Sequence, residues 1–242
     1  METWRLITTW GAAPGFNMGL DQALLESEGA PPTLRFYTWS PDTLSLGYFQ
    51  RRRDVPAAER ARAVVRRITG GGAIHHAGEL TFSITAPLRH PLYAGPIAES
   101  YRRVHTAVRR ALAQYGVEAE FRGQRDLASD RPETGMCFHR STALDLCWDD
   151  RKGVGSAQRR TRGRVLHHGS IKLQGSSLEP EVARVDRQGV QLGAADFAPT
   201  LRRTLAVSFG LRFEPGVPDA EERGRAQELG ARYLDPAFVD RR

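Results

Sequence analysis

Three consecutive glycines, Gly70 to Gly72, place the strongest constraint on how this chain can fold. Glycine weakens the interior of a helix or strand, because it loses much conformational entropy and brings no side chain to pack. It does permit positive φ angles and close approach of the backbone to a ligand. Arg66 and Arg67 precede the glycines, His75 and His76 follow them, and residues 80–86 alternate like a half-buried strand. A run of glycines alone is also typical of a flexible loop. With these neighbours it predicts a strand, a glycine turn and a second strand, with basic and imidazole groups beside backbone amides.

The length allows one large α/β domain or two small ones, and no repeat, low-complexity linker or composition shift within residues 1–242 forces a domain boundary. Apolar residues at helical spacing predict helices over residues 18–28 (capped by Asn17), 97–115, 199–209 and 219–233, and a short helix over residues 54–62. Strands are expected over residues 4–8, 64–69, 80–86, 117–121, 143–148, 152–158 and 165–173, with two more within residues 32–50 around a Ser40-Pro41-Asp42 turn.

The net charge of +7 invites comparison with nucleic-acid-binding proteins. Only two of the 35 basic residues are lysines, Lys152 and Lys172, so the basic character is best explained by a coding bias toward arginine. Clusters such as Arg51-Arg52-Arg53 can still attract an acidic protein or a polyanion, although a solvated face explains most of them. A nucleic-acid partner is therefore not favoured.

The bias toward arginine suggests that a lysine retained in this chain is needed as a lysine. An ammonium is compact and its pKa can shift, unlike that of a guanidinium. Nothing else in the sequence distinguishes Lys172, so Lys172→Arg is expected to be nearly silent.

The chain has no apolar run near the roughly 20 residues that cross a bilayer, and its N-terminus lacks the apolar core of a secretory signal. Its two cysteines, Cys137 and Cys147, are too few for a disulfide framework and do not have metal-ligand spacing. We therefore expect a cytoplasmic, reduced protein that has no membrane partner and no metal site.

A second group of candidate residues lies between Cys137 and residue 173. Lys152 begins the segment Lys-Gly-Val-Gly-Ser-Ala-Gln, and His168-Gly169-Ser170 is expected to return on a neighbouring strand beside that lysine. A histidine such as His168 is more often structural than functional. Cys137 follows a glycine in a polar loop, with His139 and Arg140 close behind, which favours a reactive thiol. Cys147 lies in an alternating apolar segment and fits an inert role better.

Several separated motifs, in order, resemble the lipoate–protein ligase/octanoyltransferase family, which is related to the biotin ligases. They are residues 17–25 (Asn-Met-Gly-Leu-Asp-Gln-Ala-Leu-Leu), 34–41 (Leu-Arg-Phe-Tyr-Thr-Trp-Ser-Pro), 45–50 (Ser-Leu-Gly-Tyr-Phe-Gln), 66–75, 152–158 and 168–170. The resemblance implies one α/β cofactor-transferase domain, with mixed sheets packed against helices. It also implies that the glycine stretch and the lysine strand line an acyl pocket, whose invariant lysine is Lys152. The substrate-binding residues implied in this way are Arg67, Gly70, Gly71, Gly72, His75, Phe82, Gly155, Ser156, Ala157, His168, Gly169 and Ser170. The family often has His-Asp where this chain has His75-His76-Ala77, and the register favours His75 as the family histidine.

Two chemistries occur in such a family. The segment around Cys137-Phe138, upstream of the lysine strand, resembles an octanoyltransferase branch in which a cysteine carries the acyl group. That resemblance implies Cys137 and Lys152 as catalytic residues, no cofactor, acyl carrier protein as donor, and a lysine of a lipoyl domain or glycine-cleavage H protein as acceptor. The alternatives are an ATP-dependent lipoate ligase, which would need ATP and Mg²⁺ and leave Cys137 idle, and a non-enzymatic protein that binds carrier domains.

Overall fold

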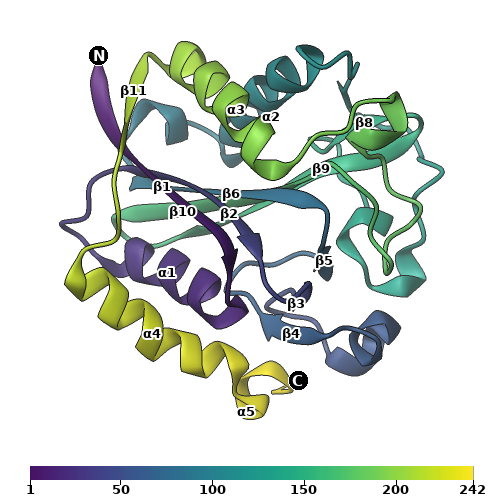
Figure 1. Ribbon diagram of the computed structural model, residues 1–242, viewed down its shortest axis with the longest axis horizontal. Coiled ribbons are helices and arrows are strands. Elements are labelled where there is room, and N and C mark those ends of the chain that lie inside the picture. Colours follow the sequence, from purple (N-terminus) through teal and green to yellow (C-terminus); the bar gives the residue numbers. More distant parts are fainter. Residues whose placement is uncertain (242) are drawn as a thin grey trace.

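An eight-stranded mixed sheet crosses the molecule in the computed structural model, which describes residues 1–241 (Figure 1). Its strand order is β11-β1-β2-β6-β10-β9-β8-β7. The strands are β1 (Glu2–Ala12), β2 (Thr33–Trp39), β6 (Glu79–Pro87), β7 (Glu120–Phe121), β8 (Leu146–Trp148), β9 (Arg151–Arg160), β10 (Arg164–Lys172) and β11 (Leu211–Pro215). Strand β1 pairs in parallel with β11 and β2, and the other pairs are antiparallel.

A three-stranded sheet of order β4-β3-β5 lies beside the large sheet and carries the glycine stretch (Figure 1). It consists of β3 (Thr43–Leu46), β4 (Ala63–Arg66) and β5 (Ile74–His76). Strand β4 leads into Gly70–Gly72 and β5 leaves them, so the glycines form a turn between two strands, as predicted. The second strand was expected over residues 80–86, which form β6 of the large sheet, and β5 was not expected.

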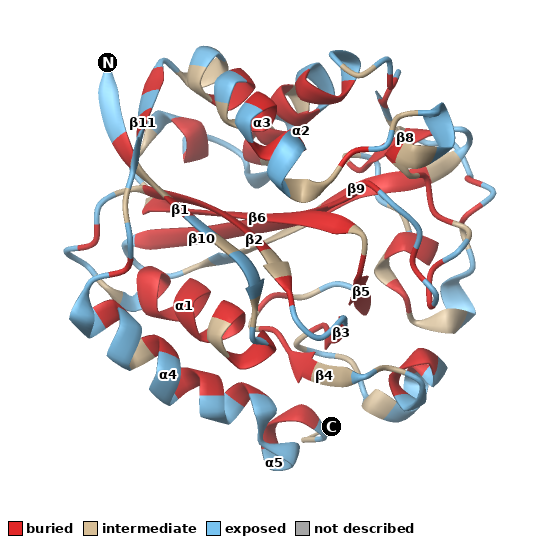
Figure 2. Cartoon of the chain, in the orientation of Figure 1, coloured by how far each residue is buried: buried red, intermediate tan, exposed pale blue. Residues whose placement is uncertain are grey.

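Helices cover both faces of the large sheet. Helices α2 (Ile97–Ala113) and α3 (Ala194–Phe209) lie on one face, and α1 (Pro14–Glu26) and α4 (Ala220–Leu234) on the other, with the short α5 (Pro236–Val239) at the chain's end (Figure 1). Strands β2, β6 and β10 are consequently buried along almost their whole length (Figure 2). Among residues 1–241, no helix is both long enough and apolar enough to span a membrane.

The alternation in β6 separates an apolar face from a polar one. Leu80, Phe82 and Ile84 join the main hydrophobic core together with α2 and α3, as their spacing predicted. The intervening Thr81 and Ser83 are equally buried, on the face under α1, where they form hydrogen bonds. A strand in the middle of a sheet covered on both sides must satisfy its polar side chains inside the protein.

An ion pair between Asp21 of α1 and Arg35 of β2 organises this polar layer, and both residues are buried. The Asp21 carboxylate also accepts hydrogen bonds from the hydroxyls of Tyr37 (2.9 Å) and Ser83 (2.7 Å). Burial alone would raise the pKa of Asp21, but Arg35 and the hydrogen bonds outweigh it and keep the pKa below its usual value. The helix is thus attached to two central strands through one carboxylate.

Several element boundaries differ from the sequence prediction. Helix α1 begins at Pro14, because proline suits the first helical position, so Asn17 lies inside the helix and donates to the carbonyl of Thr38 (3.1 Å). Helix α3 begins at Ala194 and contains Pro199. The short helix over residues 54–62 is replaced by two 3₁₀ turns, Arg52–Asp54 and Pro56–Glu59. Strand β7 keeps only Glu120–Phe121 of residues 117–121, β8 keeps only Leu146–Trp148 of residues 143–148, and β11 was not expected.

We predict that Asp21→Asn lowers the free energy of unfolding by about 3–5 kcal/mol, because it leaves the buried Arg35 guanidinium without its counter-ion. Urea denaturation at pH 7 measures the change. The matched control is the exposed pair of Arg225 and Glu26, 3.0 Å apart, where Arg225→Ala should change stability by less than about 1 kcal/mol. Equal effects of the two substitutions would contradict the central role of Asp21.

Candidate active site

The thiol of Cys137 and the ammonium of Lys152 meet at the start of β9, an inner strand of the large sheet. Cys137 begins a 3₁₀ turn, Cys137–His139, and Lys152 is the second residue of β9. Lys152 Nζ lies 3.5 Å from Cys137 Sγ and donates a hydrogen bond to the Cys137 carbonyl oxygen at 3.0 Å. Cys137 is partly exposed, whereas Lys152 is buried. The geometry pairs an accessible nucleophile with a buried cation.

Asp145 fixes the charge state of Lys152. Its Oδ2 atom lies 2.8 Å from Lys152 Nζ and accepts a hydrogen bond from the backbone N–H of Thr142 at 2.6 Å. Burial alone would lower the pKa of Lys152, but Asp145 and Cys137 outweigh it and raise the pKa above its ordinary value. Lys152 is therefore an ammonium at neutral pH, which can donate hydrogen bonds to a thiolate or to a developing oxyanion.

The glycine turn, Gly70–Gly72, packs directly against the 3₁₀ turn Cys137–His139, here called the cysteine turn. The backbone N–H of Cys137 donates to the carbonyl of Ala73 at 2.7 Å, and a Cβ placed on Gly72 would lie 2.7 Å from the Cys137 nitrogen. Gly71 has a φ of 95°, a conformation that favours glycine. The Arg67 guanidinium donates to the carbonyls of Gly70 (2.8 Å) and Gly72 (2.6 Å), which holds the turn in place. Gly72 thus allows the close packing of two backbone segments, and Gly71 supplies the positive φ of the turn.

A narrow cavity adjoins this site, and its exposed wall is almost wholly apolar. It is lined by Met18, Tyr37, Trp39, Ser45, Arg67, Ile74, His76, Thr81, Gly155, Ser156, Ala157, His168, Gly169 and Ser170. Gly155 separates the cavity from the lysine, because a Cβ at this glycine would lie 2.8 Å from Lys152 Cε. Ile74 packs with Phe138, next to the cysteine. An apolar chain in this cavity would have its polar end close to Cys137 and Lys152.

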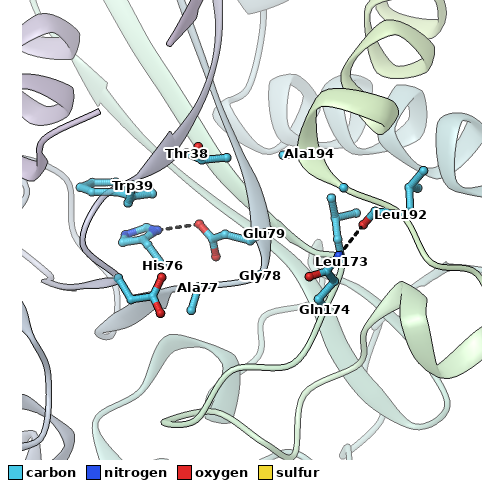
Figure 3. A pocket seen from close by; sticks show the side chains of 12 residues that line it. Thr38, Trp39, His76, Ala77, Gly78, Glu79, Leu173, Gln174, Leu192 and Ala194 are labelled. Carbon is cyan, nitrogen blue, oxygen red and sulfur yellow. Dashed lines mark hydrogen bonds and ion pairs between the residues drawn. The ribbon is translucent and has the colours of Figure 1, made fainter. Parts of the chain in front are cut away.

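Trp39 and His76 form one wall of the cavity as a stacked pair, with ring centroids 4.1 Å apart. Trp39 Nε1 donates to the Thr81 hydroxyl. Nδ1 of His76 lies 2.6 Å from a Glu79 carboxylate oxygen (Figure 3). The same two rings also line a second, more open pocket of about 460 Å³, which Figure 3 shows together with Glu79, Leu173 and Gln174. Neither Cys137 nor Lys152 lines either pocket, but Gly155 and Ile74 of the narrow cavity adjoin Lys152 and Phe138, so the narrow cavity is the one next to the thiol and the ammonium.

The structure brings most of the expected residues to the cavity but not all of them. Arg67, Gly155, Ser156, Ala157, His168, Gly169 and Ser170 line it. The three glycines lie at the cysteine turn, outside this lining, and Phe82 belongs to the main core on the other face of the sheet. His75 points away, with Nδ1 2.7 Å from the Ser176 hydroxyl, so His76 is the imidazole at the cavity.

Other expectations concern the surroundings of the thiols and of Lys172. His139 does not supply a cation beside Cys137: its Nδ1 atom lies 2.9 Å from the Thr134 hydroxyl, and burial together with Arg131 lowers the pKa of His139. Cys147 is buried in β8, as predicted, and burial raises the pKa of its thiol.

Lys172 is fully buried and paired with Glu79 and Glu179, so the expectation that Lys172→Arg is nearly silent loses its basis.

Sequence reasoning missed Tyr37, Trp39, His76 and Asp145 as site residues. Tyr37 and Trp39 lie in the 34–41 segment, whose resemblance to the family was the available signal. Asp145 offered the weaker signal of an acidic residue within an otherwise apolar stretch.

A thiol, an ammonium and an apolar cavity thus lie together in an α/β domain, next to the glycine turn. Residues 13–184 match the model of the lipoyl protein ligase A/B catalytic domain, and the chain belongs to this family. It is 36% identical to octanoyltransferase LipM of Kyrpidia tusciae, over 97% of each chain. It is also 36% identical to octanoyltransferase LipM of Moorella thermoacetica, over 100% of this chain and 99% of that one. A bi-partite lipoate protein ligase from Thermoplasma acidophilum has the same fold, with a TM-score of 0.79 and 20% identity over 99% and 97% of the two chains.

We predict that Gly72→Ala lowers the free energy of unfolding by about 1–3 kcal/mol, because the added methyl group collides with the backbone of Cys137. The matched control is Gly224→Ala on an open face of α4, where nothing lies within 4 Å of the added carbon and alanine should stabilise the helix by about 0.5–1 kcal/mol. Chemical denaturation measures both changes. Unchanged stability in Gly72→Ala would mean that the two turns are not tightly packed.

Proposed function

We propose that the protein is an octanoyltransferase that moves an octanoyl group from acyl carrier protein to a lysine of a lipoyl domain or glycine-cleavage H protein, through a thioester on Cys137. The single observation that carries the proposal is the contact of Lys152 Nζ with Cys137 Sγ at 3.5 Å, beside an apolar cavity. The names of the K. tusciae and M. thermoacetica relatives, which align over nearly the whole chain, support octanoyl transfer.

The first step is thiol–thioester exchange. The Cys137 thiolate attacks the carbonyl carbon of the donor thioester, a new C–S bond forms, and the bond to the carrier thiol breaks. The proton given up by Cys137 ends on the departing carrier thiol. Negative charge develops on the carbonyl oxygen, where a donor such as Lys152 stabilises it, and losing one such donor typically costs about 10²–10³ in rate.

In the second step the neutral ε-amine of the acceptor lysine attacks the acyl-enzyme. An amide forms, the C–S bond to Cys137 breaks, and the amine's proton returns to the thiolate. The reaction needs neither ATP nor an oxidant, because the energy of the donor thioester drives amide formation. The alkyl part of the octanoyl group occupies the apolar cavity, where each buried methylene contributes about 0.8 kcal/mol of binding.

The partners are acidic carrier proteins on this proposal, and the positive charge of the chain favours them. A net charge of +7 steers an acidic partner toward the surface and speeds association at low salt. Arg140 lies exposed three residues after Cys137, and its carbonyl oxygen accepts a hydrogen bond from Lys152 at 3.4 Å. The T. acidophilum ligase was described together with its E2 lipoyl domain, which is the acceptor class proposed here.

We predict that incubation with octanoyl-carrier protein, without ATP, adds one octanoyl mass to the protein and that the adduct maps to Cys137. Cys137→Ser should abolish both adduct and turnover, while Cys147→Ser preserves both because that thiol is buried. Intact mass and peptide mapping make the measurement. An adduct on Cys147, or on neither cysteine, sinks the thioester mechanism. Activity of Cys137→Ser with ATP and free lipoate would identify a ligase, and carrier binding without any reaction would identify a non-enzymatic protein.

We also predict that Lys152→Arg loses most of its transfer activity, on the order of 10²-fold, while the fold survives. The planar guanidinium keeps the positive charge next to Asp145. It has no single nitrogen that can contact the thiol and the carbonyl oxygen of Cys137 together, as Lys152 Nζ does. Steady-state transfer rates and a thermal melt test the two parts separately. Near-native turnover in a folded Lys152→Arg variant would remove Lys152 from the mechanism.

A further inference from the structure

Lys172, the second of the two lysines, lies at the centre of a buried ion cluster beside the cysteine turn. It is the last residue of β10, and its side chain is fully buried. Its Nζ atom lies 2.8 Å from Glu79 and 2.9 Å from Glu179, and it donates a third bond to the carbonyl of His75 at 2.6 Å. One ammonium thus connects the end of β5, the start of β6 and the loop after β10.

The pKa values of the two carboxyl groups in this cluster are shifted in opposite directions. Burial raises the pKa of Glu79, but Lys172 and His76 outweigh burial and hold the pKa well below its usual range. Burial also raises the pKa of Glu179, and there Lys172 only partly opposes it. Both carboxyl groups lie within ion-pair distance of Lys172. Glu79 also accepts hydrogen bonds from Thr81 and Ser170 and faces Nδ1 of His76, so the cluster extends to the wall of the acyl cavity.

The ring of Phe138 links this cluster to the nucleophile. Phe138 directly follows Cys137 and is fully buried against Ile74 and Val182. Lys172 Nζ lies 4.7 Å from the ring centroid, and Lys152 Nζ lies 5.2 Å from the same centroid. The face of an aromatic ring carries negative potential and attracts a desolvated cation. The two lysines of the chain therefore both act on the side chain next to the reactive cysteine.

We propose that Lys172 is a positioning residue: through Phe138, it holds the Cys137 turn at the place where Lys152 reaches the thiol. The proposal rests on the proposed function only in taking Cys137 as the nucleophile. Lys172 touches neither substrate nor thiol in this role. Its three acceptors fix the ammonium, the ammonium fixes the ring, and the ring fixes the turn that carries Cys137. An arginine cannot replace it, because a planar guanidinium needs more volume than this fully buried position provides.

The test compares Phe138→Leu and Lys172→Met in a Cys147→Ser background, which leaves Cys137 as the one thiol. Phe138→Leu keeps the ion cluster and most of the apolar volume but removes the ring. The matched control is Phe197→Leu in α3, a fully buried phenylalanine in the core on the opposite face of the sheet. The first readout is the rate of Cys137 alkylation by iodoacetamide between pH 5 and pH 10, and the second is kcat and KM for octanoyl transfer.

We expect Phe138→Leu and Lys172→Met to raise the pH of half-maximal alkylation by roughly one unit, because the thiolate moves away from a cation. We expect kcat to fall by about 10–100-fold, with KM little changed, as when a reacting group is misplaced. Combining the two substitutions should add little further loss, since both break the same link. Phe197→Leu should leave the alkylation profile and kcat unchanged.

An alkylation profile of Phe138→Leu that equals that of Phe197→Leu overturns the proposal, whatever the melting temperatures, because a purely structural role would lower stability alone. A native profile in Lys172→Arg would equally overturn the need for an ammonium. If Lys172→Met fails to fold, Phe138→Leu still decides. Alkylation uses no acyl donor, so it tests the positioning role even if octanoyl transfer is not the reaction.

Discussion

A buried ammonium needs acceptors on every side, and this requirement at Lys152 gives the candidate site its form. Removing an ion from water costs several kcal/mol unless partners in the protein compensate for it. Lys152 finds such partners in the Asp145 carboxylate and in the carbonyls of Cys137 and Arg140. Two of these partners lie in the turn that carries the thiol. The contacts that compensate the buried charge of Lys152 therefore also place the thiol of Cys137.

The cavity depends on a second polar layer, under α1. His168 of the cavity wall has its Nδ1 atom 3.3 Å from Asp21 and its Nε2 atom 2.6 Å from the hydroxyl of Thr69, just before the glycine turn. Asp21 in turn pairs with Arg35. The sequence favoured a structural role for His168. Its contacts with Asp21 and Thr69 fit that role, yet His168 also lines the cavity. The layer that attaches α1 to the sheet also orients the wall against which an acyl chain would lie.

The parts of the fold with strong local signals were predictable from sequence. Apolar periodicity predicts the long helix α2 and the strands β6, β9 and β10, and the run of glycines predicts the turn. The large sheet is mixed, as the family resemblance implied. The short strands β7 and β11 were mispredicted because two to five residues carry little pattern and are defined by distant partners.

At the candidate site, too, the sequence predicts some features and not others. Alternation states which residues share a face but not which face meets a cavity. His75 and His76 are neighbours on one short strand, so their side chains point to opposite faces, and the choice of His75 selects the imidazole that does not line the cavity. The role of Phe138 depends on two ammonium groups from different strands, which no sequence pattern reveals.

The arginine bias of the sequence has a structural counterpart in the interior. Arg66 is buried and donates to the carbonyls of Gly47, Gln50 and Val239, a spread of acceptors that suits a planar guanidinium fork. Lys152 and Lys172 instead have their acceptors gathered around a single nitrogen. On the surface either cation serves, so coding bias can replace lysine by arginine at little cost. Inside the protein the arrangement of acceptors decides between them, which explains why the lysines that remain in this chain are both buried, and both lie over the ring of Phe138 next to Cys137.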